Sequence, residues 1–239
     1  MLGGRVLLRQ PAKGYRAGLD AALLAAACDA KPGEVVADAG CGVGAVMLAA
    51  AVRRPAADRF IGFEVDKAAW ELAEQNIAAN GLGERVMAQY EDILDPPRMA
   101  WRMFFDAILC NPPFFDDAGA IRGPHPTKRR AFMADAGLGS WIKALFAVTR
   151  QGATITVIHR ADRLADILAL LGAKAGSFQV RPVHPFEGEP AGRVLVRAVR
   201  GGRAPLRLLP PLVLHERGRL GHTAAVEAIL RGEADLPWL

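Results

Sequence analysis

The sequence has few cysteines and no long apolar run. None of its apolar runs reaches the ~18 residues that a membrane-spanning helix needs, and residues 1–10 carry scattered arginines without a signal-peptide cleavage pattern. The three cysteines, Cys28, Cys41 and Cys110, are widely spaced in apolar surroundings, as is usual for buried free thiols of cytosolic proteins. We therefore expect a cytoplasmic protein without a membrane partner.

Patterns that would bind a metal or a nucleoside triphosphate are also missing. No Cys-x-x-Cys pair occurs, and the five histidines show no ligand spacing, so we expect no metal site. No Walker A lysine stands near the glycine-rich turn at residues 38–44, which argues against a nucleotide triphosphatase.

Charge is distributed unevenly along the chain, whose formal net charge is +5. Residues 1–111 carry 12 Lys and Arg against 14 Asp and Glu, a net charge of −2, whereas residues 112–239 carry 18 against 11, a net charge of +7. A basic surface is typical of proteins that contact nucleic-acid phosphates. An arginine-rich surface from a high-GC genome has the same composition, so charge alone leaves both explanations open.

Strand and helix patterns alternate along the chain, and its 239 residues suit one α/β domain. This order, with seven strand patterns, predicts a mostly parallel sheet with helices on both faces. The last two strands have no helix between them and should form an antiparallel pair at one edge. Residues 116–137 lack periodicity, and loops of that length are usually functional lids or disordered. Strands are predicted at 34–39, 59–65, 85–90, 106–110, 153–159, 177–183 and 193–199, and helices at 18–30, 45–54, 66–80, 140–150, 162–171 and 223–231.

Residues 106–115, Asp-Ala-Ile-Leu-Cys-Asn-Pro-Pro-Phe-Phe, are the most informative segment. The strand stops at Asn111, and two prolines that cannot donate to a sheet ladder then force a stiff turn. This turn presents the Asn111 amide, the Pro112 carbonyl and the Phe114 ring. Two acceptors beside a stacking surface suit an unpaired adenine, cytosine or guanine, or a primary amide. The alternative for Asn111 is a turn residue that caps the strand.

A glycine-rich turn, Asp-Ala-Gly-Cys-Gly-Val-Gly at residues 38–44, follows the first strand. Alternate glycines let the backbone turn sharply and approach a ligand beside a helix amino terminus. Glu64 ends the second strand, where it can accept hydrogen bonds from ribose hydroxyls. Asp92 follows the third strand, where it can accept from an adenine amino group. A loose dinucleotide fingerprint also fits the glycines, although a dehydrogenase would need a proton donor where the two prolines stand.

In combination, these motifs resemble those of class I S-adenosylmethionine-dependent methyltransferases over roughly residues 15–200. Residues 9–20 (Arg-Gln-Pro-Ala-Lys-Gly-Tyr-Arg-Ala-Gly-Leu-Asp) more narrowly resemble the opening of bacterial tRNA adenine-N6 methyltransferases, which modify the adenine next to the anticodon of a valine tRNA. Residues 222–230 are similar to the tail of that family, although His222 stands where a tyrosine is usual. The resemblance implies a single Rossmann-like methyltransferase domain with an amino-terminal closing segment (1–30), a catalytic core (31–200) and a carboxyl-terminal extension (201–239).

The resemblance also implies a cofactor, S-adenosylmethionine, that is converted to S-adenosylhomocysteine and lies across the carboxyl ends of the first strands. Tyr15, Arg16 and Asp20 would close over it near the substrate entrance, although Tyr15 also suits a core position. The residues implied to bind the cofactor are Tyr15, Asp20, Asp38, Gly40, Gly42, Gly44, Glu64, Asp92, Ile93 and Asn111.

On this interpretation the Asn111 oxygen and the Pro112 carbonyl accept the two hydrogens of an exocyclic amine. They would direct its lone pair toward the methyl group and stabilise the charge developing on nitrogen. Phe114 would stack on the base, a contact of ~1–3 kcal/mol, and the base must be unpaired, as in an anticodon loop. Phe115 suits a packed core position as well as a substrate contact. The predicted substrate contacts are Pro113, Phe115, Lys128, Arg129 and Arg130, with Arg193 and Arg197 as further phosphate contacts.

The expected partner is therefore a tRNA, and the oligomeric state stays open, with a monomer favoured. The same chemistry on guanine N2 of ribosomal RNA, on DNA adenine or on a protein glutamine is an alternative. Enzymes of those kinds usually carry an additional domain, which is not evident here. A non-catalytic RNA-binding protein on this fold and a Rossmann dehydrogenase are the remaining alternatives.

Overall fold

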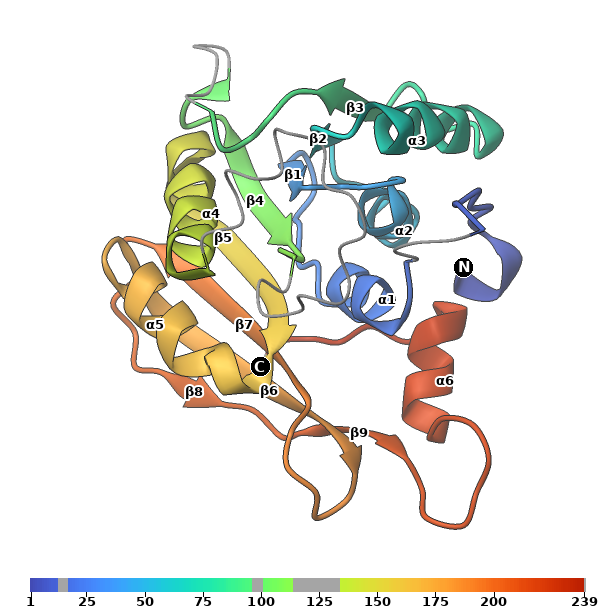
Figure 1. The fold of residues 1–239 in the computed structure, drawn as a ribbon, viewed down its shortest axis with the longest axis vertical. Coiled ribbons are helices and arrows are strands. Elements are labelled where there is room, and N and C mark those ends of the chain that lie inside the picture. The colour runs from blue at the N-terminus through green and yellow to red at the C-terminus, as the bar shows by residue number, and fades with distance from the viewer. Residues whose placement is uncertain (13–16, 96–100, 114–133, 239) are drawn as a thin grey trace.

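The computed structural model describes residues 1–12, 17–95, 101–113 and 134–238, which form an α/β sandwich around one mixed sheet (Figure 1). Its order is β3-β2-β1-β4-β5-β7-β6-β8, and β9 also pairs with β6. Strands β1 to β5 run parallel, whereas β7 is antiparallel to both of its neighbours, β5 and β6. The strands are β1 (Val35–Ala39), β2 (Arg59–Glu64), β3 (Val86–Tyr90), β4 (Phe105–Cys110), β5 (Thr149–Arg160), β6 (Ala175–Phe186), β7 (Arg193–Arg200), β8 (Arg207–Leu208) and β9 (Leu212–His215).

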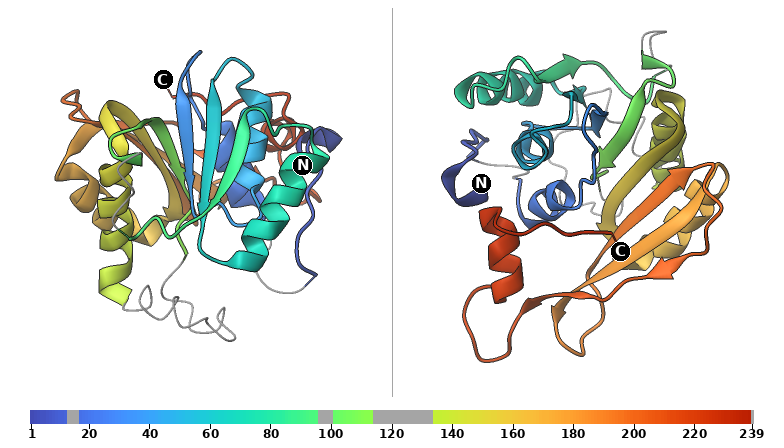
Figure 2. Two further views of the ribbon diagram at one scale, coloured as in Figure 1. Left: turned by 90° about the horizontal axis from the view of Figure 1, so that it is seen from above. Right: turned by 180° about the vertical axis from the view of Figure 1, so that it is seen from behind.

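Helices cover both faces of this sheet (Figure 2). One core cluster joins one face to α1, α2, α3 and α6, and a second joins the opposite face to α4 and α5. Asp66 caps α3 as predicted, since its side chain accepts from the backbone N–H groups of Ala68 and Ala69. The helices are η1 (Leu2–Gly4), α1 (Leu19–Ala26), α2 (Ala45–Arg53), α3 (Lys67–Ala79), α4 (Ala134–Val148), η4 (Ala161–Arg163), α5 (Leu164–Gly172) and α6 (Ala224–Arg231).

The predicted fold class is confirmed, with three corrections. The described residues form nine strands rather than seven, because residues 201–239 add β8 and β9. The antiparallel pair β6–β7 forms, but it is not at the edge, since β8 and β9 pair along the outer side of β6. Helix α4 begins at Ala134, within the segment predicted to lack periodicity.

The carboxyl-terminal segment returns to the amino-terminal one. A guanidinium nitrogen of Arg5 donates to the carbonyl of Gly232 at 2.6 Å. The backbone N–H of Leu236 donates to the Ala26 carbonyl at 3.0 Å, and the indole N–H of Trp238 donates to the Ala27 carbonyl at 2.7 Å. Residues 224–238 therefore cover the outer side of α1.

Candidate active site

The polar motifs predicted from the sequence meet along one edge of the sheet. Ala39 is in register with Cys110 on one side and with Phe63 on the other. The glycine turn after β1 therefore lies between Asn111, which follows β4, and Glu64 at the end of β2. Glu64 is in turn opposite Tyr90 in β3. Because adjacent strands are about 4.8 Å apart, these motifs extend over roughly 14 Å.

The glycine turn is shaped by two glycines with different surroundings. Gly40 has φ +71° and Gly42 has φ +56°, a conformation that side chains rarely adopt. A Cβ on Gly40 would lie 2.7 Å from the ring of Trp141 in α4, whereas a Cβ on Gly42 would meet no atom of the described residues within 4 Å. Packing therefore requires Gly40, while Gly42 keeps its side of the turn open for a ligand. Gly44 begins α2 as its N-cap residue.

The Glu64 carboxylate connects the ends of β1 and β2. Its Oε2 accepts from the backbone N–H of Gly42 at 2.9 Å, and its Oε1 accepts from the N–H of Asp66 at 2.7 Å. These two bonds fix the orientation of the carboxylate, and carboxylate oxygens also accept from hydroxyl donors. This chemistry fits the ribose of a nucleoside.

Asp38 is buried directly beneath the glycine turn, and it is 2% exposed. Its Oδ2 accepts from the Met47 N–H in α2 at 3.1 Å. Burial raises the pKa of Asp38 to about 7; the Met47 hydrogen bond opposes this rise and the charge of Glu64 adds to it. A cationic group bound at the turn would favour the ionised carboxylate, which suits the positively charged methionine part of the predicted cofactor.

Asp92 and Ile93 form a tight turn shortly after β3. The Asp92 carboxylate accepts from the Leu94 N–H at 2.9 Å, and its carbonyl accepts from the Asp95 N–H at 3.1 Å. Ile93 is buried in the second core cluster. A carboxylate held beside an apolar residue at this end of the sheet suits an adenine ring.

The catalytic motif is described as far as Pro113. Asn111 is half-buried, Pro112 is buried and Pro113 is exposed. The other predicted residues of the substrate side lie outside the described residues and remain predictions; these are Tyr15, Arg16, Phe114, Phe115, Lys128, Arg129 and Arg130.

Two late arginines have carboxylate partners in or just after α1. Arg193 pairs with Asp20, with 3.0 Å between Nε and Oδ2. Arg197 pairs with Asp29 at 2.7 Å and is 15% exposed at its side chain; it also donates to Gln179. The Arg197 pairings fit a structural role, whereas Asp20 and Arg193 border a cavity at the same edge of the sheet as Asn111.

One residue that supports the site was not predicted. Asn76 of α3 is completely buried, and its amide donates to the carbonyls of Arg9 and Val43, each at 2.9 Å. Its oxygen accepts from the Arg9 N–H at 2.7 Å. This single side chain holds the amino-terminal segment against the glycine turn. A pair of asparagines one helical turn apart, Asn76 and Asn80, was the available signal.

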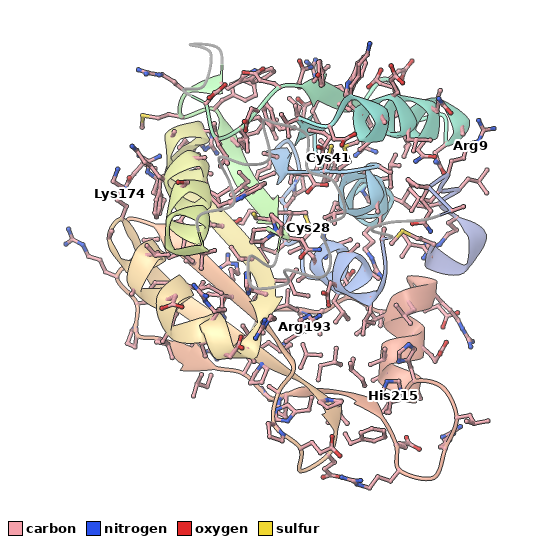
Figure 3. All side chains as sticks on the ribbon, in the orientation of Figure 1. Arg9, Cys28, Cys41, Lys174, Arg193 and His215 are labelled. Atoms are coloured by element: carbon pink, nitrogen blue, oxygen red, sulfur yellow. The ribbon has the colours of Figure 1, made fainter. Side chains whose placement is uncertain are left out.

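The cysteines are buried, as predicted. Burial raises the pKa of Cys28 to about 12 and the pKa values of Cys41 and Cys110 well above the ordinary value. Such thiols are poor nucleophiles at neutral pH. Figure 3 shows Cys28 and Cys41 within the layer around α1 and α2. Among the described residues, no group of three His, Cys, Asp or Glu side chains could hold a metal ion, and no helix is long and apolar enough to cross a membrane.

Comparisons with known proteins agree with this geometry. The family model of the methyltransferase small domain matches residues 16–123. A Shewanella frigidimarina protein named tRNA1(Val) (adenine(37)-N6)-methyltransferase is 31% identical over 190 residues, which cover 77% of this chain and 74% of the relative. A Pasteurella multocida protein of the same name is 33% identical, but the match spans 42% of each chain. A Salmonella agona protein named ribosomal RNA large subunit methyltransferase F is 33% identical over 57% of this chain and 53% of its own length.

Among solved structures, Atu636 from Agrobacterium tumefaciens, described as a predicted O-methyltransferase, superposes with a TM-score of 0.75 and 26% identity over 92% of this chain and 99% of its own. The chain belongs to the class I S-adenosylmethionine-dependent methyltransferases, and S-adenosylmethionine is its cofactor.

Proposed function

We propose that this methyltransferase modifies the exocyclic amine of an unpaired adenine in tRNA, in the anticodon loop of a valine tRNA. The observation that carries the proposal is the position of the Asn-Pro-Pro turn. Asn111 follows β4 directly beside the glycine turn of β1, because Cys110 and Ala39 are in register. Acceptors for an amine therefore lie next to the backbone that holds the methyl donor.

The chemistry divides between cofactor and protein. The cofactor supplies an electrophilic methyl group on a sulfonium centre. The Asn111 oxygen and the Pro112 carbonyl accept the two N–H hydrogens of the adenine amine. These two hydrogen bonds direct the nitrogen lone pair toward the methyl group. Acceptors fixed before the reaction stabilise the positive charge that develops on nitrogen. No strong base is needed, because the amine proton becomes acidic as the new bond forms.

Burial supports this role for the turn. Pro112 is buried and Asn111 is half-buried, so packing against the rest of the protein restricts both residues that carry the acceptors. Pro112 has no N–H and restricts the preceding residue, which limits the conformations of Asn111. We infer that the turn is fixed before substrate binds, as orientation-based rate acceleration requires.

Two observations favour RNA as the acceptor. Residues 112–239 carry a net charge of +7, which suits a phosphate-bearing substrate. Relatives from several bacteria carry the name tRNA1(Val) (adenine(37)-N6)-methyltransferase, and two of them align over about three quarters of their length. Phe114 as the stacking ring and Lys128, Arg129 and Arg130 as phosphate contacts remain part of this proposal.

The direct test uses purified protein, radiolabelled S-adenosylmethionine and total tRNA from a strain that lacks this gene. We expect labelled N6-methyladenosine after digestion to nucleosides. Asn111→Ala should lower turnover at least about a hundredfold, the size of the loss when one transition-state hydrogen bond is removed, and calorimetry at saturating cofactor should show that the variant still binds S-adenosylmethionine. Asn80→Ala, far from the turn, serves as the matched control. Near-wild-type turnover of Asn111→Ala would refute the role of this turn.

Ribosomal RNA is the second candidate acceptor, because one relative is named ribosomal RNA large subunit methyltransferase F. Label in ribosomal RNA, DNA or a protein glutamine, without label in tRNA, would support the proposed methyl transfer but show that tRNA is not the substrate. Cofactor binding without label in any acceptor would favour a non-catalytic RNA-binding protein.

A further inference from the structure

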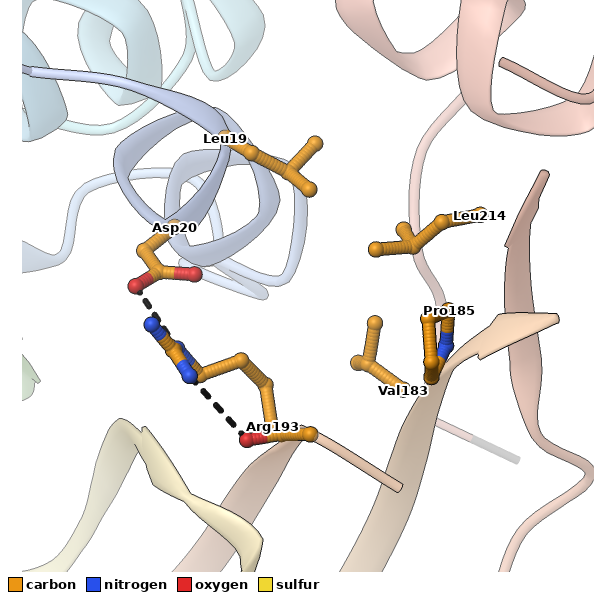
Figure 4. Close-up of a pocket in the computed structure, with 7 residues that line it drawn as sticks. Leu19, Asp20, Val183, Pro185, Arg193 and Leu214 are labelled. Atoms are coloured by element: carbon orange, nitrogen blue, oxygen red, sulfur yellow. Dashed lines mark hydrogen bonds and ion pairs between the residues drawn. The ribbon is translucent and has the colours of Figure 1, made fainter. Parts of the chain in front are cut away.

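A cavity of about 410 Å³ lies at the active-site edge of the sheet, between the start of α1 and the ends of β6 and β9 (Figure 4). Strand β6 is antiparallel to β7, and β7 is antiparallel to β5. The carboxyl ends of β6 and β5 therefore point the same way, toward the edge where Asn111 follows β4. The cavity and the proposed catalytic turn open at one edge of the sheet.

The cavity combines apolar walls with one ion pair. Leu19, Val183, Pro185 and Leu214 form the walls, and Asp20 and Arg193 form the polar side. A carboxylate accepts from ring or exocyclic N–H groups, and a guanidinium donates to carbonyl or phosphate oxygens. Apolar walls with this pair of functions suit a nucleobase and its phosphate. The volume is within the ~300–1,000 Å³ of small-molecule sites.

A series of rings continues outward from the cavity. Phe186 and His215 immediately follow the wall residues Pro185 and Leu214 in sequence. The Phe186 and His215 ring centroids are 5.5 Å apart, and His215 stacks on His222 at 4.7 Å with an interplanar angle of 24°. The Arg217 guanidinium lies 5.4 Å from the Phe186 ring centroid. Stacked rings beside a cation are how proteins bind unpaired bases. We call Phe186, His215, His222 and Arg217 the ring series.

The cavity is a few nucleotides away from the target position. Strands β4 and β6 are separated by β5 and β7, which is roughly 14 Å across the sheet. The register places Cys110 level with Val180, so Pro185 lies a further five residues along β6, and the two positions are roughly 20 Å apart. Stacked nucleotides in one strand advance about 3.4 Å each, which corresponds to about six nucleotides, or fewer in an extended loop.

We propose that the cavity and the ring series form a second RNA subsite, which binds an unpaired nucleotide a few positions from the methylated adenine. This inference depends on the proposed function, because it assumes an RNA substrate. The base would enter between Leu19 and Leu214, with Asp20 and Arg193 at its polar edge. Asp20 would then contact this base rather than the cofactor. The next base along the strand would stack on the ring series, and Arg217 would neutralise a phosphate.

The test measures RNA affinity by fluorescence anisotropy, with a fluorescein-labelled anticodon stem-loop of valine tRNA and saturating S-adenosylhomocysteine. Leu214→Trp, which fills the cavity, and His215→Ala, which removes a ring, should each raise the Kd for RNA about tenfold, as loss of one stacking contact does. Cofactor affinity and melting temperature should stay close to wild type.

An exposed pair of arginines supplies a matched control. The Arg217 side chain is 69% exposed and pairs with Glu189. The Arg59 side chain is similarly exposed, at 59%, and pairs with Asp58. Arg59 lies at the opposite edge of the sheet, where β2 begins. Arg217→Ala should raise the Kd for RNA about fivefold and flatten its salt dependence, because one phosphate contact is lost. Arg59→Ala should stay within twofold.

Single abasic positions in the stem-loop locate the bound nucleotide. One loop position should weaken wild-type binding about tenfold when abasic and have no effect in Leu214→Trp, because the two changes remove the same contact. If wild type binds and methylates the RNA but Leu214→Trp, His215→Ala and Arg217→Ala all bind within twofold of it, the second subsite is wrong and the proposed function stands. If wild type neither binds nor methylates any RNA, both proposals are wrong.

Discussion

Replacing Asn76 by leucine should weaken both the fold and cofactor binding. Asn76 makes three hydrogen bonds to backbone groups, two with Arg9 and one with Val43, and no part of it is exposed. Leucine keeps the branched shape and the number of side-chain heavy atoms but makes none of these bonds. At about 1 kcal/mol net for each bond, the free energy of unfolding should fall by about 3 kcal/mol, which lowers Tm by about 6–12 °C in a domain of this size.

The cofactor measurement separates this residue from a general stabiliser. Val43 belongs to the glycine turn, so loss of its bond should loosen that turn and raise the Kd for S-adenosylmethionine in calorimetry. Asn80→Ala is the matched control, because the Asn80 side chain makes two hydrogen bonds with Leu7 and one with the backbone carbonyl of Asn76, and none with the glycine turn. It should lower Tm with little change in Kd. Equal loss of cofactor affinity in both variants, or an unchanged Tm in Asn76→Leu, would refute this reasoning.

Two further predictions concern the glycine turn and the carboxylate beneath it. Gly40→Ala should destabilise the protein by about 2 kcal/mol or more, because the new Cβ would meet Trp141 at 2.7 Å. A Cβ added by Gly42→Ala would meet no atom within 4 Å among the described residues. This variant should therefore lower the free energy of unfolding by only about 1 kcal/mol, through backbone strain, while raising the Kd for S-adenosylmethionine over tenfold. Asp38 has a pKa of about 7 in the fold against about 3.9 unfolded. The native state therefore holds this proton more tightly, and the stabilisation present below pH 4 is lost as pH rises to 7. Urea unfolding should show that the free energy of unfolding falls between pH 5 and pH 8 by about 2–3 kcal/mol more in wild type than in Asp38→Asn. An equal fall in both proteins would contradict the raised pKa of Asp38.

The sequence was sufficient to predict β1 to β5 and their parallel arrangement. Each of these strands is a buried apolar run, and each polar motif stands where its run ends. Since the carboxyl ends of parallel strands share one edge, Asn111, the glycine turn and Glu64 were expected at the same edge of the sheet. The strand order, with β1 between β2 and β4, comes from the structure and brings the three motifs together.

Other features depend on contacts that no local pattern encodes. Strands β8 and β9 have two and four residues and stand beside prolines at 205, 210 and 211, so neither has a strand signal of usual length. Asn76 contacts backbone atoms of residues 9 and 43. Because every residue has backbone groups of this kind, such contacts cannot be predicted from residue types. Gly40 is required by Trp141, about a hundred positions later. Such requirements appear only when distant segments pack.

The meeting of the two chain ends has a consequence for the order of folding. Arg5 bonds to Gly232, and Trp238 to Ala27, across 227 and 211 positions of sequence. Contacts this distant cost loop-closure entropy before they add stability, so we expect them to form after the parallel strands and their crossover helices. Until then α1, whose residues 21–26 are all buried in the native state, would present an apolar side to solvent. We therefore expect the nascent domain to be prone to aggregation through this side of α1 until residues 224–238 dock in the last step of folding.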